Sequence, residues 1–111
     1  MKLNKGPFYM IKSGLKTIEL RLFDDKRQAI QIGDHICFHR YDKLEETIEA
    51  QVVHLYHFQT FEELYQTLPL LSCGYTKDNI NQASAHDMIQ YYSLEQQKKY
   101  GVVGIEIRIL K

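Results

Sequence analysis

Four polar side chains that could act together chemically lie within six residues of the chain: Lys16, Thr17, Glu19 and Arg21. A lysine serves as a general base when burial or a neighbouring cation, here Arg21, lowers its pKa. A glutamate can activate a water molecule while a nearby lysine or arginine stabilises the developing charge. The same groups can instead bind, because an arginine held by a carboxylate is oriented toward a ligand phosphate, carboxylate or base edge. Lys16 and Glu19 are therefore the catalytic candidates, and all four residues are candidates for ligand binding.

Alternating polarity predicts the strand that positions these residues. Apolar and polar residues alternate from Thr17 to Leu22. The apolar face, which must pack on a core, consists of Ile18, Leu20 and Leu22. The opposite face consists of Thr17, Glu19 and Arg21, with Lys16 at its entrance. If another element covers this polar face, an ion pair between Glu19 and Arg21 is expected, since an unpaired buried charge is too costly.

Tyrosines offer a second kind of contact. The chain has eight tyrosines and five phenylalanines but no tryptophan. Tyr75 in a loop, and Tyr91 and Tyr92 on a later helix, could stack on nucleic-acid bases. Aromatic side chains at helical spacing more often pack into a core, so both interpretations stay open for Tyr91 and Tyr92. Tyr75 joins the predicted ligand-binding residues.

The spacing of histidines and cysteines predicts no metal site. His54 and His57 are three residues apart in a predicted strand, which puts them on opposite faces. The two cysteines, Cys37 and Cys73, have no metal-ligand spacing and are expected to be reduced thiols. We therefore expect no metal and no cofactor.

Length and charge narrow the classes of function. A chain of 111 residues with 44% hydrophobic and 25% charged residues is expected to form one domain, residues 1–111. Lys plus Arg and Asp plus Glu each number 14, and this balance argues against a strongly basic surface for a long phosphate backbone. No apolar run approaches membrane-spanning length and no signal-peptide core is present. The chain is therefore expected in the cytoplasm, with no membrane partner.

In the first half of the chain, one helix and two further strands are predicted around the strand 17–22. The helix begins near Pro7, has Phe8, Ile11 and Leu15 at helical spacing, and ends at Gly14. A turn at residues 32–34 precedes the strand 35–41, and a polar loop over residues 42–46 leads to a long strand, 47–58. Along that strand the inward-pointing residues occupy even-numbered positions up to Val52 and odd-numbered positions from Val53. This change predicts a bulge at Val52–Val53 and hence a sheet that curls.

In the second half, two helices and a closing strand are predicted. A capping box at Thr60 begins a helix that ends before Pro69, and an irregular segment over residues 68–82 follows. Gly74 and Tyr75 in this segment would suit either a mobile lid or a fixed loop. Ser84 caps a second helix that continues past Ser93, and residues 103–109 alternate as a strand. This order favours an α+β fold, a small mixed or antiparallel barrel with flanking helices.

The segment from Gly14 to Arg21 resembles the Gly-x-Lys-x-x-Glu-x-Arg signature of ASCH domains, the activating signal cointegrator homology domains. Further landmarks of this family extend over nearly the whole chain. They are Pro7-Phe8, Ile32-Gly33-Asp34, the run from Phe58 to Leu64, and Tyr100-Gly101-Val102-Val103-Gly104-Ile105. The resemblance implies a PUA-like β-barrel with a cleft beside it, lined by Lys16, Glu19 and Arg21.

The resemblance also implies a class of ligand. The family is thought to bind RNA or related ligands. Some relatives are enzymes: one subgroup removes the acetyl group from acetylated cytidine, and another member has been described as a ribonuclease. In the amide-hydrolase subgroup the signature lysine acts as base, a threonine at the place of Glu19 is the nucleophile, and a downstream glutamate is the acid. This chain keeps Lys16 but has Glu19 instead of that threonine, and residues 79–84 contain no glutamate.

Three functions are thus compared. The leading hypothesis is a module that binds RNA or a small nucleotide-like ligand in the cleft through Lys16, Thr17, Glu19, Arg21 and Tyr75. The alternative is a hydrolase that acts on a modified nucleoside, such as the amide of acetylated cytidine, or on an RNA phosphodiester. The third is a protein-interaction domain with no ligand in the cleft. The sequence gives neither the identity of the ligand nor the oligomeric state.

Overall fold

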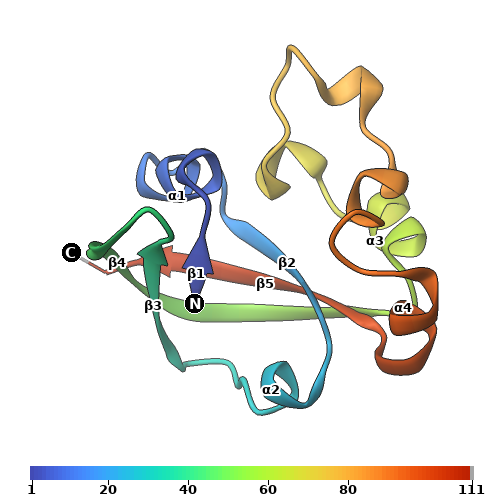
Figure 1. Ribbon diagram of the computed structural model, residues 1–111, viewed down its shortest axis with the longest axis horizontal. Coiled ribbons are helices and arrows are strands. Elements are labelled where there is room, and N and C mark those ends of the chain that lie inside the picture. Colours follow the sequence, from blue (N-terminus) through green and yellow to red (C-terminus); the bar gives the residue numbers. More distant parts are fainter. Residues whose placement is uncertain (111) are drawn as a thin grey trace.

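The computed structural model describes residues 1–110 as a five-stranded sheet curled into a half-barrel and flanked by helices (Figure 1). The strands are β1 (Lys2–Leu3), β2 (Ile18–Leu22), β3 (His35–Arg40), β4 (Lys43–Phe58) and β5 (Val102–Ile109). The helices are α1 (Lys5–Lys12), α2 (Asp25–Gln28), α3 (Phe61–Thr67) and α4 (Leu94–Tyr100). Three short 3₁₀ helices lie between α3 and α4: η1 (Leu70–Cys73), η2 (Ile80–Gln82) and η3 (Ala85–Met88). The predicted α+β class is confirmed.

The long strand β4 organises the sheet, whose strand order is β1-β3-β4-β5-β2. All neighbouring pairs are antiparallel except β1 and β3. The register between β4 and β5 shifts between Val52 and His54, so Val53 is an extra residue. This confirms the bulge that the change of parity predicted, and such a bulge bends the strand so that the sheet can curl.

Both faces of the sheet are covered, and this decides where the polar side chains of β2 point. On one face, a core under α1 contains Phe8, Ile11, Phe38, Val103 and Ile105. On the other face, a second core under α3 contains Ile18, Leu20, Leu22, Phe61 and Leu64. Glu19 is paired with Ile105 and Arg21 with Val103, and directly opposed residues point to the same face. Glu19 and Arg21 therefore lie on the face of α1.

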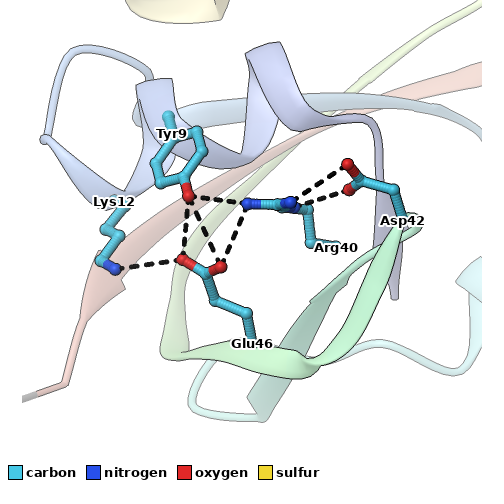
Figure 2. A network of polar contacts seen from close by, with 5 residues as sticks. All are labelled: Tyr9, Lys12, Arg40, Asp42 and Glu46. Atoms are coloured by element: carbon cyan, nitrogen blue, oxygen red, sulfur yellow. Dashed lines mark hydrogen bonds and ion pairs between the residues drawn. The ribbon is translucent and has the colours of Figure 1, made fainter.

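A polar network ties α1 to the hairpin formed by β3 and β4 (Figure 2). The Arg40 guanidinium donates to Asp42 at 2.6 and 3.1 Å, to the Tyr9 hydroxyl at 2.7 Å and to Glu46 at 3.1 Å. Lys12 of α1 reaches the same Glu46 carboxylate at 3.3 Å. The Arg40 side chain is 13% exposed, so this network is less screened than an ordinary surface pair. It holds both the helix and the tip of the hairpin in place.

Gly14 terminates α1 as predicted, with φ of 83° two residues after Lys12, but Leu15 beyond it is 64% exposed and does not pack with the helix. Two other predicted boundaries were wrong. The polar loop over residues 42–46 is instead a short turn at Tyr41–Asp42, because Arg40 holds the polar residues that follow in an extended ribbon. The late helix is two elements, η3 and α4, and each begins at its own capping box, at Ser84 and at Ser93.

Candidate functional site

A cavity of about 570 Å³ lies along β2. Ligand pockets typically measure about 300–1,000 Å³. Lys16, Glu19 and Arg21 line it from the β2 side. Residues of β1, α1 and the turn after β3 line it as well, as do residues of the segment 73–92. In Figure 1, α1 and this yellow-to-orange segment rise on either side of the start of β2.

The charged residues of the cavity form one connected cluster centred on Glu19. Lys16 Nζ donates to Glu19 Oε1 at 2.7 Å. Arg21 donates to Glu19 Oε2 from Nη2 at 2.9 Å and from Nε at 3.2 Å. The side chains of Lys16, Glu19 and Arg21 are only 10%, 4% and 16% exposed. The ion pair expected between Glu19 and Arg21 is therefore present, and Lys16 extends it to a triad.

The two cations decide the charge state of the buried carboxylate. Burial by itself raises the pKa of Glu19, but the charges and hydrogen bonds of Lys16 and Arg21 outweigh it, so this pKa lies below its usual value. Burial likewise opposes the charged form of Arg21, and Glu19 and Tyr92 more than offset it, so the guanidinium pKa is raised. With one carboxylate and two cations, the cluster carries a formal charge of +1.

Close backbone packing at Gly74 holds Lys16 in the cluster. Gly74 follows η1 with φ of 112°, a conformation that favours glycine. A Cβ at this position would lie 3.4 Å from Lys16 Cδ and 3.8 Å from Lys16 Nζ. The Thr17 backbone N–H also donates to the Ser72 carbonyl at 2.9 Å. The irregular segment after α3 is thus fixed against the start of β2 where it covers Lys16.

Tyr75 lines the cavity, but its hydroxyl is already bonded. It donates to Asp87 Oδ2 at 2.7 Å and lies 2.7 Å from the Tyr65 hydroxyl. Burial and these two contacts raise the Tyr75 pKa, so its hydroxyl stays protonated. Tyr75 therefore links α3 to η3 through its hydroxyl group.

The structure corrects the expectation for Thr17. Thr17 does not line the cavity but belongs, with Glu106 and Arg108, to a second depression of about 430 Å³. The Thr17 carbonyl still accepts a hydrogen bond from the Ile107 N–H of β5 at 2.9 Å, so Thr17 continues the pairing of β2 with β5 but lies beside the end of β5 that lines the second depression. Lys16 is shared by both depressions.

The cavity also contains tyrosines that sequence reasoning missed or left open. Tyr41 and Tyr65 had no signal in the sequence, because each reaches the cavity from an element distant in the chain. Tyr91 lines the cavity and is 61% exposed. Tyr92 lines it too, but its ring stacks on Phe61 at 5.8 Å and packs against the second core. Both tyrosines lie between η3 and α4, not on a helix as predicted. Tyr92 follows the packing interpretation and Tyr91 stays available for stacking.

Cys73 is the other potentially reactive group in the cavity. It is 5% exposed, and burial raises the pKa of its thiol to about 11. A thiol attacks as thiolate, so Cys73 is a poor nucleophile at neutral pH. Both cysteines are free thiols in the structure.

Within residues 1–110, no three His, Cys, Asp or Glu side chains come together in a way that could hold a metal ion. In the same residues, no helix has the length and apolar character needed to cross a membrane.

Comparison with known proteins agrees with this fold. A family model described as the ASCH domain matches residues 1–111, and the chain therefore belongs to the ASCH domain family. None of the curated proteins matches the sequence significantly.

Solved structures share the whole architecture. The crystal structure of the hypothetical protein PH0355 aligns with a TM-score of 0.75 at 28% identity, over 99% of this chain and 100% of that one. The solution structure of protein PF0455 from Pyrococcus furiosus aligns with a TM-score of 0.70 at 26% identity, over 100% of this chain and 99% of that one. Membership of the family supports an RNA-binding or hydrolase-like domain, and the choice between these must come from the site.

Proposed function

We propose that the chain binds RNA or a small nucleotide-like ligand in the cavity along β2. The observation that carries this proposal is the buried Lys16–Glu19–Arg21 cluster at a cavity of ligand size. If the only role of Glu19 were to stabilise the fold by pairing with two cations, no cavity would be needed beside it. A replacement of such a buried triad by apolar residues is often neutral or stabilising, so stability alone is a weak reason for it.

The donors of the cluster favour a ligand with phosphate or carbonyl oxygens. An ammonium has three N–H donors, and Lys16 gives one to Glu19. A guanidinium has five, and Arg21 directs Nε and Nη2 toward Glu19 and the Lys2 carbonyl. The remaining N–H groups, with a formal charge of +1, suit an anionic or carbonyl oxygen.

The tyrosines favour a ligand with a planar ring. Tyr75 and Tyr91 both line the cavity. Stacking on an aromatic side chain is worth about 1–3 kcal/mol per base. The neutral net charge of the chain favours a compact target, such as one splayed base, over a long phosphate backbone.

The same cavity gives hydrolysis less support. The Thr17 hydroxyl lies in the other depression, the Cys73 thiol stays protonated, and Glu19 is occupied by two cations. Lys16 acts as a hydrogen-bond donor to Glu19, whereas a general base needs a free lone pair.

An amide NMR titration with a short single-stranded RNA and with free nucleosides tests the proposal. Shifts should cluster at Lys16–Arg21 and Tyr75 while the RNA stays intact. Lys16→Ala should weaken binding by about 1–3 kcal/mol, as for the loss of a charge-assisted contact. Lys98→Ala, which removes an exposed charge on α4 outside the cavity, should leave it unchanged.

Three results would count against binding in this cavity. No shifts at near-millimolar RNA or nucleoside would reject the ligand class. Equal affinities of wild type and Lys16→Ala would reject the site. RNA degraded by wild type but not by Lys16→Ala would favour the hydrolase. Thermal unfolding of each variant should be measured first, since Glu19 loses a partner in Lys16→Ala.

A further inference from the structure

We propose that the site takes two consecutive nucleotides of a single strand, with one base in the cavity and the neighbouring base stacked on Tyr41. This inference rests on the proposed function and extends it from a single nucleotide unit to a dinucleotide. It gives a role to Tyr41, whose side chain belongs neither to the ion cluster nor to a hydrophobic core.

Tyr41 has the exposure of a contact residue. Its side chain is 60% exposed, it lines the cavity, and it belongs to neither hydrophobic core. A tyrosine supplies a large, amphipathic contact surface at a low cost in conformational entropy. It lies in the turn between β3 and β4, where most of its surface is open to solvent.

The turn that carries Tyr41 is held rigidly. Its two sequence neighbours, Arg40 and Asp42, are joined by two hydrogen bonds of 2.6 and 3.1 Å. Arg40 is in turn anchored to the Tyr9 hydroxyl of α1 (Figure 2). The backbone N–H of Tyr41 donates to the Leu3 carbonyl at 2.9 Å. A turn held in this way loses little freedom on binding, which favours affinity.

Strand β1 places Tyr41 beside the ion cluster. Arg21 Nη2 donates to the carbonyl of Lys2, and the N–H of Tyr41 donates to the carbonyl of the next residue, Leu3. The carbonyls of successive strand residues point to opposite edges, so Arg21 and Tyr41 contact this short strand from its two sides. Both also line the cavity, so a ligand bound at Arg21 can extend along it toward Tyr41.

The charge of Lys2, which lies on β1 between Arg21 and Tyr41, fits the phosphate that links two nucleotides. The Lys2 side chain is exposed and lines the cavity. A lysine at this position can neutralise the phosphate that joins the two nucleotides. The cations, the linking phosphate and an exposed aromatic ring together match a single strand, because every base has a face that can stack.

Three ligands test the inference by calorimetry: a nucleoside monophosphate, a dinucleotide, and a dinucleotide whose second position is abasic. The complete dinucleotide should bind about 5- to 150-fold more tightly than the other two, the range that one stacked base confers. Tyr41→Ala should abolish this gain, and Tyr41→Phe should keep it. Tyr41→Ala should unfold at the wild-type temperature, since the side chain packs in neither core.

Tyr91→Ala is the matched control, since Tyr91 is an equally exposed tyrosine of the cavity on a different element. It should weaken all three ligands by the same factor and leave the gain intact. Loss of the gain in Tyr91→Ala but not in Tyr41→Ala would overturn the assignment. So would equal affinities for the three ligands, although binding of the monophosphate would then still support the proposed function. If none of the three ligands binds, both proposals fail.

Discussion

At the scale of single residues, Glu19 determines the character of the site. Its carboxylate receives hydrogen bonds from both Lys16 and Arg21 and is almost completely buried. A buried carboxylate of this kind fixes the directions of two long, flexible cations. Their remaining donors are thereby positioned before any ligand arrives, which lowers the entropic cost of binding.

Glu19→Gln should destabilise the fold by about 3 kcal/mol, because Lys16 and Arg21 would be left as two neighbouring buried cations without a counter-charge. Urea denaturation at pH 7 measures this change. The matched control is Glu95→Gln, which neutralises an exposed carboxylate in the first turn of α4 and should change stability by less than about 1 kcal/mol. Equal stabilities of Glu19→Gln and wild type would mean that the triad is weakly coupled.

The stability that Glu19 contributes should also depend on pH. Lys16 and Arg21 hold the pKa of its carboxyl in the folded chain below the usual value of about 4.5. Its contribution is therefore complete above about pH 4.5 and is lost as the pH falls through the folded pKa. The difference in unfolding free energy between wild type and Glu19→Gln should be constant from pH 7 to about pH 5 and shrink in more acidic solution. A difference that grows on acidification would contradict the lowered pKa.

Sequence reasoning found the charged residues of the cavity and three of its tyrosines, Tyr75, Tyr91 and Tyr92, but missed two others. Glu19 and Arg21 are two residues apart on one strand, so local alternation was enough to put them on a common face. Tyr41 and Tyr65 line the same cavity from other elements. A pattern within one segment of sequence cannot predict that residues of distant elements lie together. Thr17 was expected beside Glu19 and Arg21 in the cavity, but it lines the second depression instead.

At the scale of elements, the contact between α3 and the sheet depends on the absence of a side chain at Gly104. This residue of β5 lies under Leu68, which directly follows α3, and beside Ile18. A Cβ would lie 2.9 Å from Leu68 Cδ1 and 3.2 Å from Ile18 Cγ2. The closeness of these packed atoms leaves no room for a methyl group.

Gly104→Ala should therefore destabilise the chain by about 1–3 kcal/mol, the usual cost of overpacking. Gly6→Ala in α1 is the control, since a Cβ there meets nothing within 4 Å. Because alanine favours a helix over glycine, Gly6→Ala should be neutral or stabilise by up to about 1 kcal/mol. Thermal unfolding followed by circular dichroism distinguishes the two. If Gly104→Ala were as stable as Gly6→Ala, α3 would have to shift freely on the sheet.

The order of the elements was largely predictable, and their ends were less so. The bulge at Val53 could be predicted because apolar residues must point inward both before and after it. One extra residue therefore moves the apolar positions from even to odd numbers. The break between η3 and α4 was missed, although each has its own capping box, because two short helices in a row share the composition of one longer helix. The early start of β4 depends on the Arg40 network, which is a tertiary contact.

At the scale of the whole molecule, charge is balanced overall and concentrated locally. Lys plus Arg and Asp plus Glu each number 14, yet the buried cluster carries a formal charge of +1 beside a cavity. Long-range attraction of a phosphate backbone is therefore weak, and the binding that we propose depends on contacts within the cavity. The proposed mode of binding therefore differs from that of basic proteins, which contact many phosphates along a nucleic-acid backbone.

The salt dependence of RNA binding should report this difference. For single strands the logarithm of the affinity falls with the logarithm of salt concentration with a slope of about −0.7 for each phosphate neutralised. One or two phosphates near Lys2, Lys16 and Arg21 predict a slope of about −1, measured by fluorescence anisotropy between about 50 and 200 mM salt. Lys2→Ala should make the slope for a dinucleotide shallower, whereas Lys99→Ala, on the last turn of α4 and outside the cavity, should leave it unchanged. A slope steeper than about −3, or one that Lys99→Ala reduces, would mean that a longer stretch of backbone binds elsewhere on the surface.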